Sequence, residues 1–176
     1  MFKEIVTERL RLRKIKLSDA KSMFLYAANK ETTRYMGWQT HNSIEETNEY
    51  LKSIMPLYKT KKYYDWAIEL KENGKMIGTC GFVNVQTNKE FAEIGYIIHQ
   101  DYHKKGYGTE AVQSLIEFGF KTLRLTKIYA RIYKENKISI RLAKKCGFTL
   151  EVQPEHPLTK DHICSGALSY SIKNAE

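Results

Sequence analysis

The sequence has few of the residues that cross-link or interrupt small proteins. It contains three prolines and three cysteines in 176 residues. Cys80, Cys146 and Cys164 are widely spaced and form no CxxC pair, so neither a disulfide framework nor a zinc site is expected. The five histidines lack ligand spacing with cysteines or carboxylates, which argues against a metal site of any kind.

Long apolar runs are also missing. No run approaches the roughly 18 residues that span a bilayer, and the opening MFKEIVTERLRLRK has no apolar segment typical of a secretory signal. We therefore expect no membrane association and a cytoplasmic location. Because no repeat, low-complexity segment or linker divides the chain, residues 1–176 are expected to form a single domain.

Acidic residues are outnumbered by basic ones. The chain carries 29 Lys and Arg against 20 Asp and Glu, a formal net charge of +9. This excess favours anionic partners, such as nucleotide cofactors, nucleic acid or acidic protein surfaces. The basic residues are spread along the chain, so no dedicated nucleic-acid stripe is evident and no stable nucleic-acid complex is expected.

Local patterns predict a mixed fold of the α/β class (α+β). Alternation of apolar and polar residues predicts strands over 9–13, 63–70, 76–85, 91–98, 127–133, 148–152 and within 163–172. Helical spacing and capping signals predict helices over 18–29, 43–55, 109–123 and 136–145. Asn73-Gly74 lies between two predicted strands and is a strong hairpin signal. We expect a mostly antiparallel sheet of about seven strands flanked by about four helices.

The central stretch of the chain, residues 94–112, reads IGYIIHQDYHKKGYGTEAV. It runs from a strand pattern through a basic loop into Gly106-Tyr107-Gly108 and then into a helix. The first turn of a helix has amides without partners and the positive end of the macrodipole, and glycine lets a ligand approach the backbone closely. This combination predicts an anion site, most often for phosphate. Alternatively, the glycines merely turn the chain.

Three motifs resemble the Gcn5-related N-acetyltransferase (GNAT) superfamily. The run HKKGYG at 103–108, followed by TEA, resembles its acetyl-CoA motif, in which Gln or Arg precedes two residues, Gly, one residue, and Gly or Ala. The segment NKISIRLAKKCGF at 136–148 is similar to the family's second cofactor motif, and TERLRLRKIKLSDA at 7–20 to its opening strand and helix. The likeness spans nearly the whole chain and is greatest to the ribosomal-protein N-terminal acetyltransferase (RimJ/RimL-type) branch.

The resemblance implies a GNAT fold, acetyl-CoA (coenzyme A) as cofactor, and direct acetyl transfer to a primary amine. The acceptor would be a protein N-terminus, possibly ribosomal, or a small molecule, and the protein would be a monomer or homodimer. Pyrophosphate would bind the amides of the glycine turn, and pantetheine the splayed end of the preceding strand. The implied cofactor-binding residues are Ile97, Ile98, His99, His103, Lys104, Lys105, Gly106, Tyr107, Gly108, Thr109, Asn136 and Ser139.

Acetyl transfer needs a base, because most amines are protonated at neutral pH. We predict Glu93, which lies on the strand before the glycine turn and resembles the catalytic glutamate of some relatives in position. Apolar neighbours such as Phe91 would raise the pKa of its carboxyl. Glu93 would otherwise be a solvated or ion-paired strand residue, and His99 is an alternative base.

A proton donor for the departing thiolate is also needed. Many relatives have a tyrosine in the helix before the Gly-Phe pair, where this chain has Leu142 and Ala143. We predict that Ser139, placed near the thioester sulfur by the resemblance, replaces it. Asn136 and Ser139 would otherwise only cap the short helix.

The resemblance also implies that acceptor specificity comes from the segment between the first two helices and from loops near the C-terminus. Tyr35, Met36 and Trp38 are the candidate substrate-binding residues, and the aromatic segment 58–64 is a second wall of the acceptor groove. These aromatics would otherwise be ordinary core, and no acidic cluster typical of a polyamine site occurs in these stretches. Two other functions remain open: a catalytically silent acyl-CoA-binding module of the same fold, and a binder of RNA or the ribosome surface.

Overall fold

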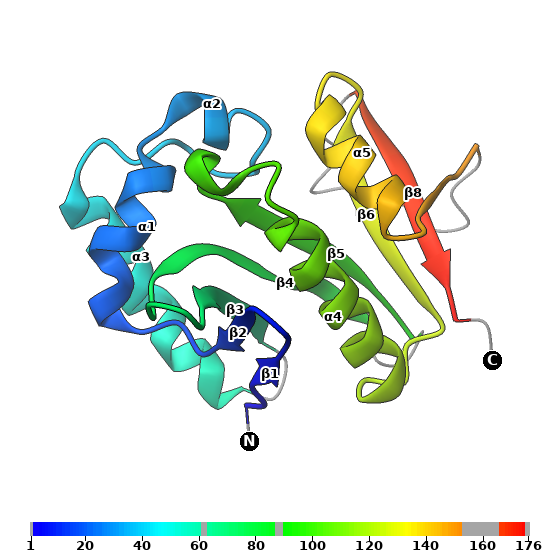
Figure 1. Cartoon of the computed structure of the whole chain (residues 1–176), viewed down its shortest axis with the longest axis horizontal. Coiled ribbons are helices and arrows are strands. Elements are labelled where there is room, and N and C mark those ends of the chain that lie inside the picture. Colours follow the sequence, from blue (N-terminus) through cyan, green and yellow to red (C-terminus); the bar gives the residue numbers. More distant parts are fainter. Residues whose placement is uncertain (1, 61–62, 87–89, 153–165, 175–176) are drawn as a thin grey trace.

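A single twisted sheet forms the centre of the molecule (Figure 1). The computed structural model describes residues 2–60, 63–86, 90–152 and 166–174. Within these ranges the sheet has eight strands in the order β1-β2-β3-β4-β5-β6-β8-β7. The strands are β1 (Ile5–Val6), β2 (Leu10–Arg13), β3 (Tyr64–Leu70), β4 (Met76–Gln86), β5 (Phe91–Ile98), β6 (Lys127–Tyr133), β7 (Thr149–Leu150) and β8 (Ala167–Lys173).

Helices cover both faces of the sheet (Figure 1). Because side chains alternate along a strand, neighbouring residues of one strand enter different cores. Trp66 of β3 and Ile98 of β5 pack in the core that includes α4, whereas Ala67 and Ile97 pack in the core that includes α1 and α3. The helices are α1 (Ala20–Ala27), α2 (Lys30–Thr33), α3 (Ile44–Ile54), α4 (Tyr107–Lys121) and α5 (Lys137–Lys145), with 3₁₀ turns at Leu17–Asp19, Met55–Lys59 and Gln100–Tyr102.

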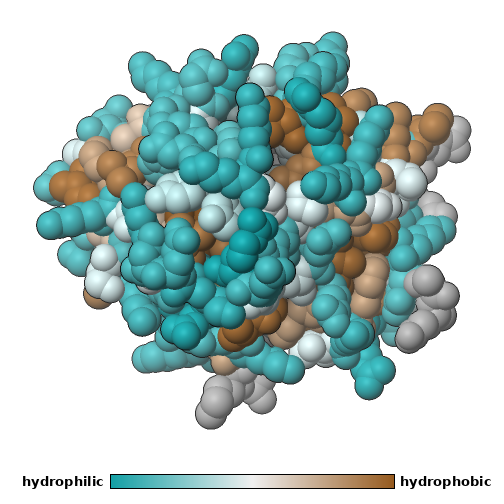
Figure 2. All heavy atoms as spheres, viewed as in Figure 1, coloured by the Kyte–Doolittle hydropathy of each residue, from teal (hydrophilic) through white to brown (hydrophobic). Residues whose placement is uncertain are grey.

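Trp66 is central to the core on the α4 face. It is fully buried, and its ring meets that of Phe118 edge-on at 5.3 Å between centroids. Its indole Nε1 donates a hydrogen bond of 2.9 Å to the carbonyl of Lys3, so the polar atom of the ring is satisfied. On the outside, the face shown in Figure 2 is mainly hydrophilic, with apolar side chains in small separate patches.

The sheet opens between β5 and β6, its one parallel pair among the described strands. Their pairing covers Phe91 with Lys127, Ala92 with Ile128 and Glu93 with Tyr129, and then stops. The antiparallel pairing of β5 with β4, in contrast, continues to Ile98. Residues 94–98 of β5 therefore have no strand partner on the β6 side, and the two strands diverge beyond this point (Figure 1).

The sequence-based fold is confirmed as a mixed, mostly antiparallel sheet with flanking helices. The strands predicted at 91–98 and 127–133 have the bounds expected, and the Asn73-Gly74 hairpin is present, with Gly74 at φ +69°. The two-residue β1 and the four-residue α2 were not predicted, because elements this short contain only about one period of a pattern. Residues 87–89 and 163–165 of the predicted turn and tail lie outside the described residues.

The start of α4 differs from the prediction. The helix begins at Tyr107 rather than at 109, since Gly106 adopts φ +86° and lets the chain enter the helix directly from the loop. Gly147 adopts φ +92° directly after the C-cap of α5, as expected from a glycine at that position.

A matched pair of leucines tests which face of the helices holds the fold together. Leu115 of α4 is 0% exposed and Leu25 of α1 is 53% exposed. We expect Leu115→Ala to lower the free energy of unfolding by about 2–5 kcal/mol, because it removes buried methyl groups and leaves a cavity. Leu25→Ala should change it by less than about 1 kcal/mol. Urea unfolding followed by circular dichroism would measure both, and equal losses would contradict the assignment of the core.

Candidate active site

The first turn of α4 has open backbone amides. The first helical hydrogen bond runs from the amide of Glu110 to the carbonyl of Gly106 at 3.0 Å. Among the described residues, none accepts a hydrogen bond from the amides of Tyr107, Gly108 or Thr109, which precede that bond. Three donors at the positive end of a helix of this length form a ready site for phosphate.

Gly108 allows this turn to sit close to its neighbours. A Cβ at Gly108 would lie 2.6 Å from Cδ1 of Leu142 in α5 and 3.2 Å from Cδ1 of Ile98 in β5. A larger residue would push α4 away from both elements. The second glycine of the motif therefore serves helix packing, and the first, Gly106, serves the backbone turn.

Side chains of the loop before α4 hold the loop in place. The ring Nε2 of His103 lies 2.8 Å from the carbonyl oxygen of Ile98, which ties the loop to the end of β5. Lys104 adopts φ +61°, and the ammonium of Lys105 lies 5.2 Å from the ring centroid of Tyr102. The cofactor contacts expected of His103, Lys104 and Lys105 stay predictions.

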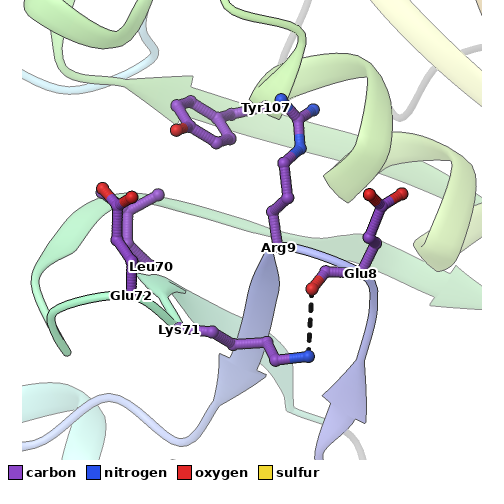
Figure 3. Close-up of a pocket in the computed structure, with 6 residues that line it drawn as sticks. All are labelled: Glu8, Arg9, Leu70, Lys71, Glu72 and Tyr107. Carbon is purple, nitrogen blue, oxygen red and sulfur yellow. Dashed lines mark hydrogen bonds between the residues drawn. The ribbon is translucent and has the colours of Figure 1, made fainter.

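Arg9, which directly precedes β2, is a part of this site that the sequence did not reveal (Figure 3). Its Nε lies 2.7 Å from Oε2 of Glu110 in the first turn of α4, and its guanidinium lies 4.7 Å from the ring centroid of Tyr107. Its Nη1 donates to the carbonyl of Lys105 at 3.0 Å. Thr7 adds a 2.6 Å bond from its hydroxyl to Oε1 of Glu110. The alternation of basic and apolar residues indicated only that Arg9 faces outward.

A small pocket lies beside Arg9. Its volume is about 190 Å³, below the roughly 300–1,000 Å³ of typical ligand sites. The ammonium of Lys71 donates a hydrogen bond of 3.0 Å to the carbonyl of Glu8 within it (Figure 3). The pocket mixes both charge signs, and we assign it no ligand. It is lined by Glu8, Arg9, Leu70, Lys71, Glu72 and Tyr107.

Glu93 lies where β5 and β6 separate. Its two carboxylate oxygens receive hydrogen bonds from Nε and Nη2 of Arg131 in β6, at 2.7 and 2.8 Å. Glu93 is therefore ion-paired, which was the alternative to the apolar environment that Phe91 led us to expect. Arg131 was missed, although it shares a strand face with Tyr129, the residue paired with Glu93. The catalytic role of Glu93 stays a prediction.

Ser139 lies beside a phenol from the diverging part of β5. The hydroxyls of Ser139 and Tyr96 are 2.7 Å apart, and burial raises the pKa of Tyr96 to about 12. Asn136 accepts a hydrogen bond of 3.1 Å from the amide of Ser139 and so caps α5. A phenol therefore lies beside Ser139, contributed by β5 and not by α5.

His99 has a structural position. Its side chain is buried, its backbone amide donates to the carbonyl of Ile77 at 2.8 Å, and its ring Nδ1 accepts from the amide of Asp101 at 3.2 Å. These bonds fix the end of β5 and the following turn. They favour the loop role for His99 over the alternative role as a base.

The three predicted acceptor residues have different contacts. The ring of Tyr35 lies 5.7 Å from that of Tyr133 at the end of β6, so it reaches the side where the sheet opens. Met36 packs against the core between α1, α3 and the sheet. The ring of Trp38 lies 5.3 Å from that of His41.

Comparisons with known proteins agree with this geometry. A family model described as "Acetyltransferase (GNAT) domain" matches residues 9–149. The chain belongs to the GNAT acetyltransferase family. The uncharacterized N-acetyltransferase YoaA of Bacillus subtilis (strain 168) is 35% identical over 151 residues, which cover 86% of this chain and 85% of that protein.

Two further proteins carry more specific names. The spermidine N(1)-acetyltransferase of Escherichia coli (strain K12) is 28% identical over 149 residues, 80% of each chain. A solved structure of a putative ribosomal-protein-serine acetyltransferase from Vibrio cholerae superposes with a TM-score of 0.81 and 25% identity, covering 98% of both chains.

Membership makes this GNAT protein an acyltransferase that uses acetyl-CoA. The residues present fit that cofactor, since the open amides of Tyr107 to Thr109 suit a diphosphate and the unpaired edge of β5 suits an amide-bearing arm. Within the part of the chain that the structure describes, no helix has the length and apolar character of a membrane span. The described His, Cys, Asp and Glu residues form no group suited to a metal ion.

A glycine pair tests the anion site. Gly106 and Gly74 both have positive φ, at +86° and +69°, but Gly74 lies in the β3–β4 hairpin. Alanine at either position should cost stability by about 1–2 kcal/mol, because a Cβ strains this backbone region. We expect only Gly106→Ala to weaken CoA binding, by about tenfold or more, in a calorimetric titration. Equal CoA affinity of both variants would contradict the site.

Glu110 gives a pH-dependent test. Desolvation raises the pKa of its carboxyl, but the bonds from Thr7 and Arg9 outweigh this and leave the pKa below the ordinary 4.5. Its contribution to stability is thus complete above about pH 4.5 and is lost as pH falls through the lower folded-state pKa. Glu110→Gln should cost about 1–2 kcal/mol at pH 7 and much less at pH 3. Urea unfolding at both pH values would measure this.

The control for this test is on the same helix. Glu117, whose side chain is 63% exposed, pairs with Lys121 at the surface. Glu117→Gln should change the free energy of unfolding by less than about 1 kcal/mol at either pH. If Glu110→Gln behaved like Glu117→Gln, the contact of Thr7 and Arg9 with α4 would not stabilise the turn.

Proposed function

We propose that this protein is a cytoplasmic N-acetyltransferase of the RimJ/RimL-type branch, which transfers acetyl from acetyl-CoA to a primary amine by direct attack on the thioester. The observation that carries the proposal is the combination of open amides at Tyr107 to Thr109 with the gap that begins after Glu93. One feature suits the diphosphate and the other the pantetheine arm of one extended cofactor. Their order along the chain, strand edge then helix start, matches the order of those groups in CoA.

The chain's own residues have three tasks. The amides of the α4 turn hold the negative charge of the diphosphate, and an unpaired amide along residues 94–98 stabilises charge on the thioester oxygen. The Ser139 hydroxyl, with Tyr96 beside it, gives a proton to the departing thiolate. The cofactor supplies the activated acetyl group.

An acyl-cysteine route has no support from the structure. Cys146 is buried, and burial raises the pKa of its thiol to about 11. Cys80 is fully buried, with a thiol pKa raised well above its ordinary value. Thiols that stay protonated at neutral pH are poor nucleophiles, so direct attack by the amine is the simpler route.

The acceptor class is a primary amine on a protein N-terminus or on a small molecule. The names of two similar proteins support different acceptors: one names spermidine, a small molecule, and the other names a ribosomal protein. The silent-module alternative loses its main support, because Tyr96 supplies the phenol that α5 lacks. The net charge of +9 alone supports a ribosome-surface role, and no described contact adds to it.

The test is turnover. The full chain would be incubated with acetyl-CoA and a panel of free N-terminal peptides, alkylamines and spermidine, with release of CoA thiol and the mass of the product as readouts. We expect acetylation of at least one amine, and a kcat about tenfold or more lower in Ser139→Ala, which loses the proton donor. Ser114→Ala on α4 is the control. Tight CoA binding with no turnover on any amine would refute the proposal.

A further inference from the structure

A row of three residues crosses the sheet on the face of α1 and α3. Asp65 of β3 pairs with Gly81 of β4, which pairs with Gly95 of β5. Gly95 lies in the stretch of β5 that has no β6 partner. Because opposed Cα atoms of antiparallel strands are about 5 Å apart, the row is about 10 Å long. It leads from Asp65 to the gap where the thioester is proposed to lie.

The two glycines contribute no side chains to the surface between Asp65 and the gap. A Cβ built on Gly95 would meet no atom of the described residues within 4 Å. A Cβ on Gly81 would lie 2.8 Å from Oδ1 of Asp65, so the carboxylate itself rests over Gly81. A group above Gly95 therefore faces the Asp65 carboxylate across glycine backbone.

Asp65 differs from Glu93 in its partners. The hydroxyl of Tyr63 donates to its Oδ2 at 3.3 Å, and in the described part of the chain no Lys, Arg or His forms an ion pair with it. Burial raises the pKa of the Asp65 carboxyl to about 7, although the bonds from Tyr63 and the amide of Trp66 lower it. Asp65 as a whole residue is half-buried, and its carboxyl is the buried part.

A second observation points to a ligand here. Tyr26 of α1 is 1% exposed, and its hydroxyl makes no hydrogen bond of good geometry, although Thr79 of β4 lies close enough to interact with it. Burial raises the pKa of this phenol, the charge of Asp65 raises it further, and the interaction with Thr79 lowers it. A buried hydroxyl that is only weakly satisfied favours a ligand that completes its hydrogen bonding. One carboxylate among phenol oxygens and rings is an environment that suits an ammonium group.

The other groups around Asp65 stay in one protonation state near neutral pH. Burial raises the pKa of Tyr50 in α3 to about 12, and it raises the pKa of Tyr58 and Tyr63 as well. Cys80 is a protonated thiol, as described above. Three ion-paired side chains also lie nearby, Arg13, Asp19 and Glu69, with Glu69 on the same face of β3 as Asp65. The ring of His41 lies 6.0 Å from that of Tyr50, and burial lowers its pKa below the ordinary value, which favours the neutral imidazole.

We infer that Asp65 binds the ammonium group of the acceptor and takes its proton, directly or through one water, before the amine attacks the thioester. This inference rests on the proposed function. The ammonium gives one proton to the carboxylate, and the free amine forms the C–N bond as the C–S bond breaks. The second proton of the nitrogen passes to the thiolate by way of Ser139 and Tyr96, and Asp65 releases its proton to solvent. The Glu93–Arg131 pair then acts as a positioning element.

The test compares three variants of the full chain across pH 5.5–9 with an amine that the wild type acetylates. We expect kcat/KM for the amine to rise with an apparent pKa near 7 in the wild type. Asp65→Asn should lower kcat/KM at pH 7 by about 100-fold and remove that rise, while the calorimetric affinity for CoA stays unchanged. Glu93→Gln and His41→Asn should keep the rise.

Three further results would decide the inference. A rise that persists in Asp65→Asn, or that disappears in Glu93→Gln or His41→Asn, would overturn it. If Asp65→Asn does not fold, Asp65→Glu replaces it: a shifted apparent pKa supports the inference and an unchanged one overturns it. A wild-type protein that binds CoA but acetylates no amine would refute the proposed function, which is a different result.

Discussion

The divergence of β5 and β6 after three residue pairs is the constraint on which the site depends. Backbone groups along a strand edge need partners, so an unpaired edge inside a sheet normally closes. Here the outer partners prevent closure. Strand β4 holds β5 as far as Ile98, and β8 pairs with β6 over its full length, from Lys127 to Tyr133. The edge of residues 94–98 therefore remains available to a ligand that carries amides.

The same constraint fixes where the anion site lies. Because β5 is held to its last residue, the loop after it starts from a fixed point, and the contact of His103 with the Ile98 carbonyl shortens its path to α4. Arg9 and Glu110 clamp the far side of the turn. The open amides are thus positioned relative to the strand edge by contacts on both sides of the glycine motif, and not by the glycines alone.

Local signals in the sequence were sufficient for the fold and for the glycine turn into α4, where the anion site is predicted. Strand alternation, the Asn73-Gly74 turn and the glycines before α4 depend on neighbours within a few residues, which the sequence displays directly. The pairs that complete the site join distant positions: Arg9 and Glu110 are 101 residues apart, and Tyr96 and Ser139 are 43 apart. A sequence pattern predicts the face on which a side chain lies but not its partner. The Arg9–Glu110 and Tyr96–Ser139 contacts could therefore not be predicted from the sequence.

The two carboxylates on the acceptor side show why partners decide roles. Glu93 and Asp65 both lie on alternating strands, and the sequence alone favoured the one nearer the glycine turn. The carboxylate of Glu93 is held in place by a guanidinium, whereas that of Asp65 lies among phenols and has a pKa that burial raises to about 7. Asp65 precedes Trp66 in an aromatic strand and resembles an ordinary outward-facing residue. Its significance comes from helices α1 and α3, whose tyrosines surround it only after the chain has folded.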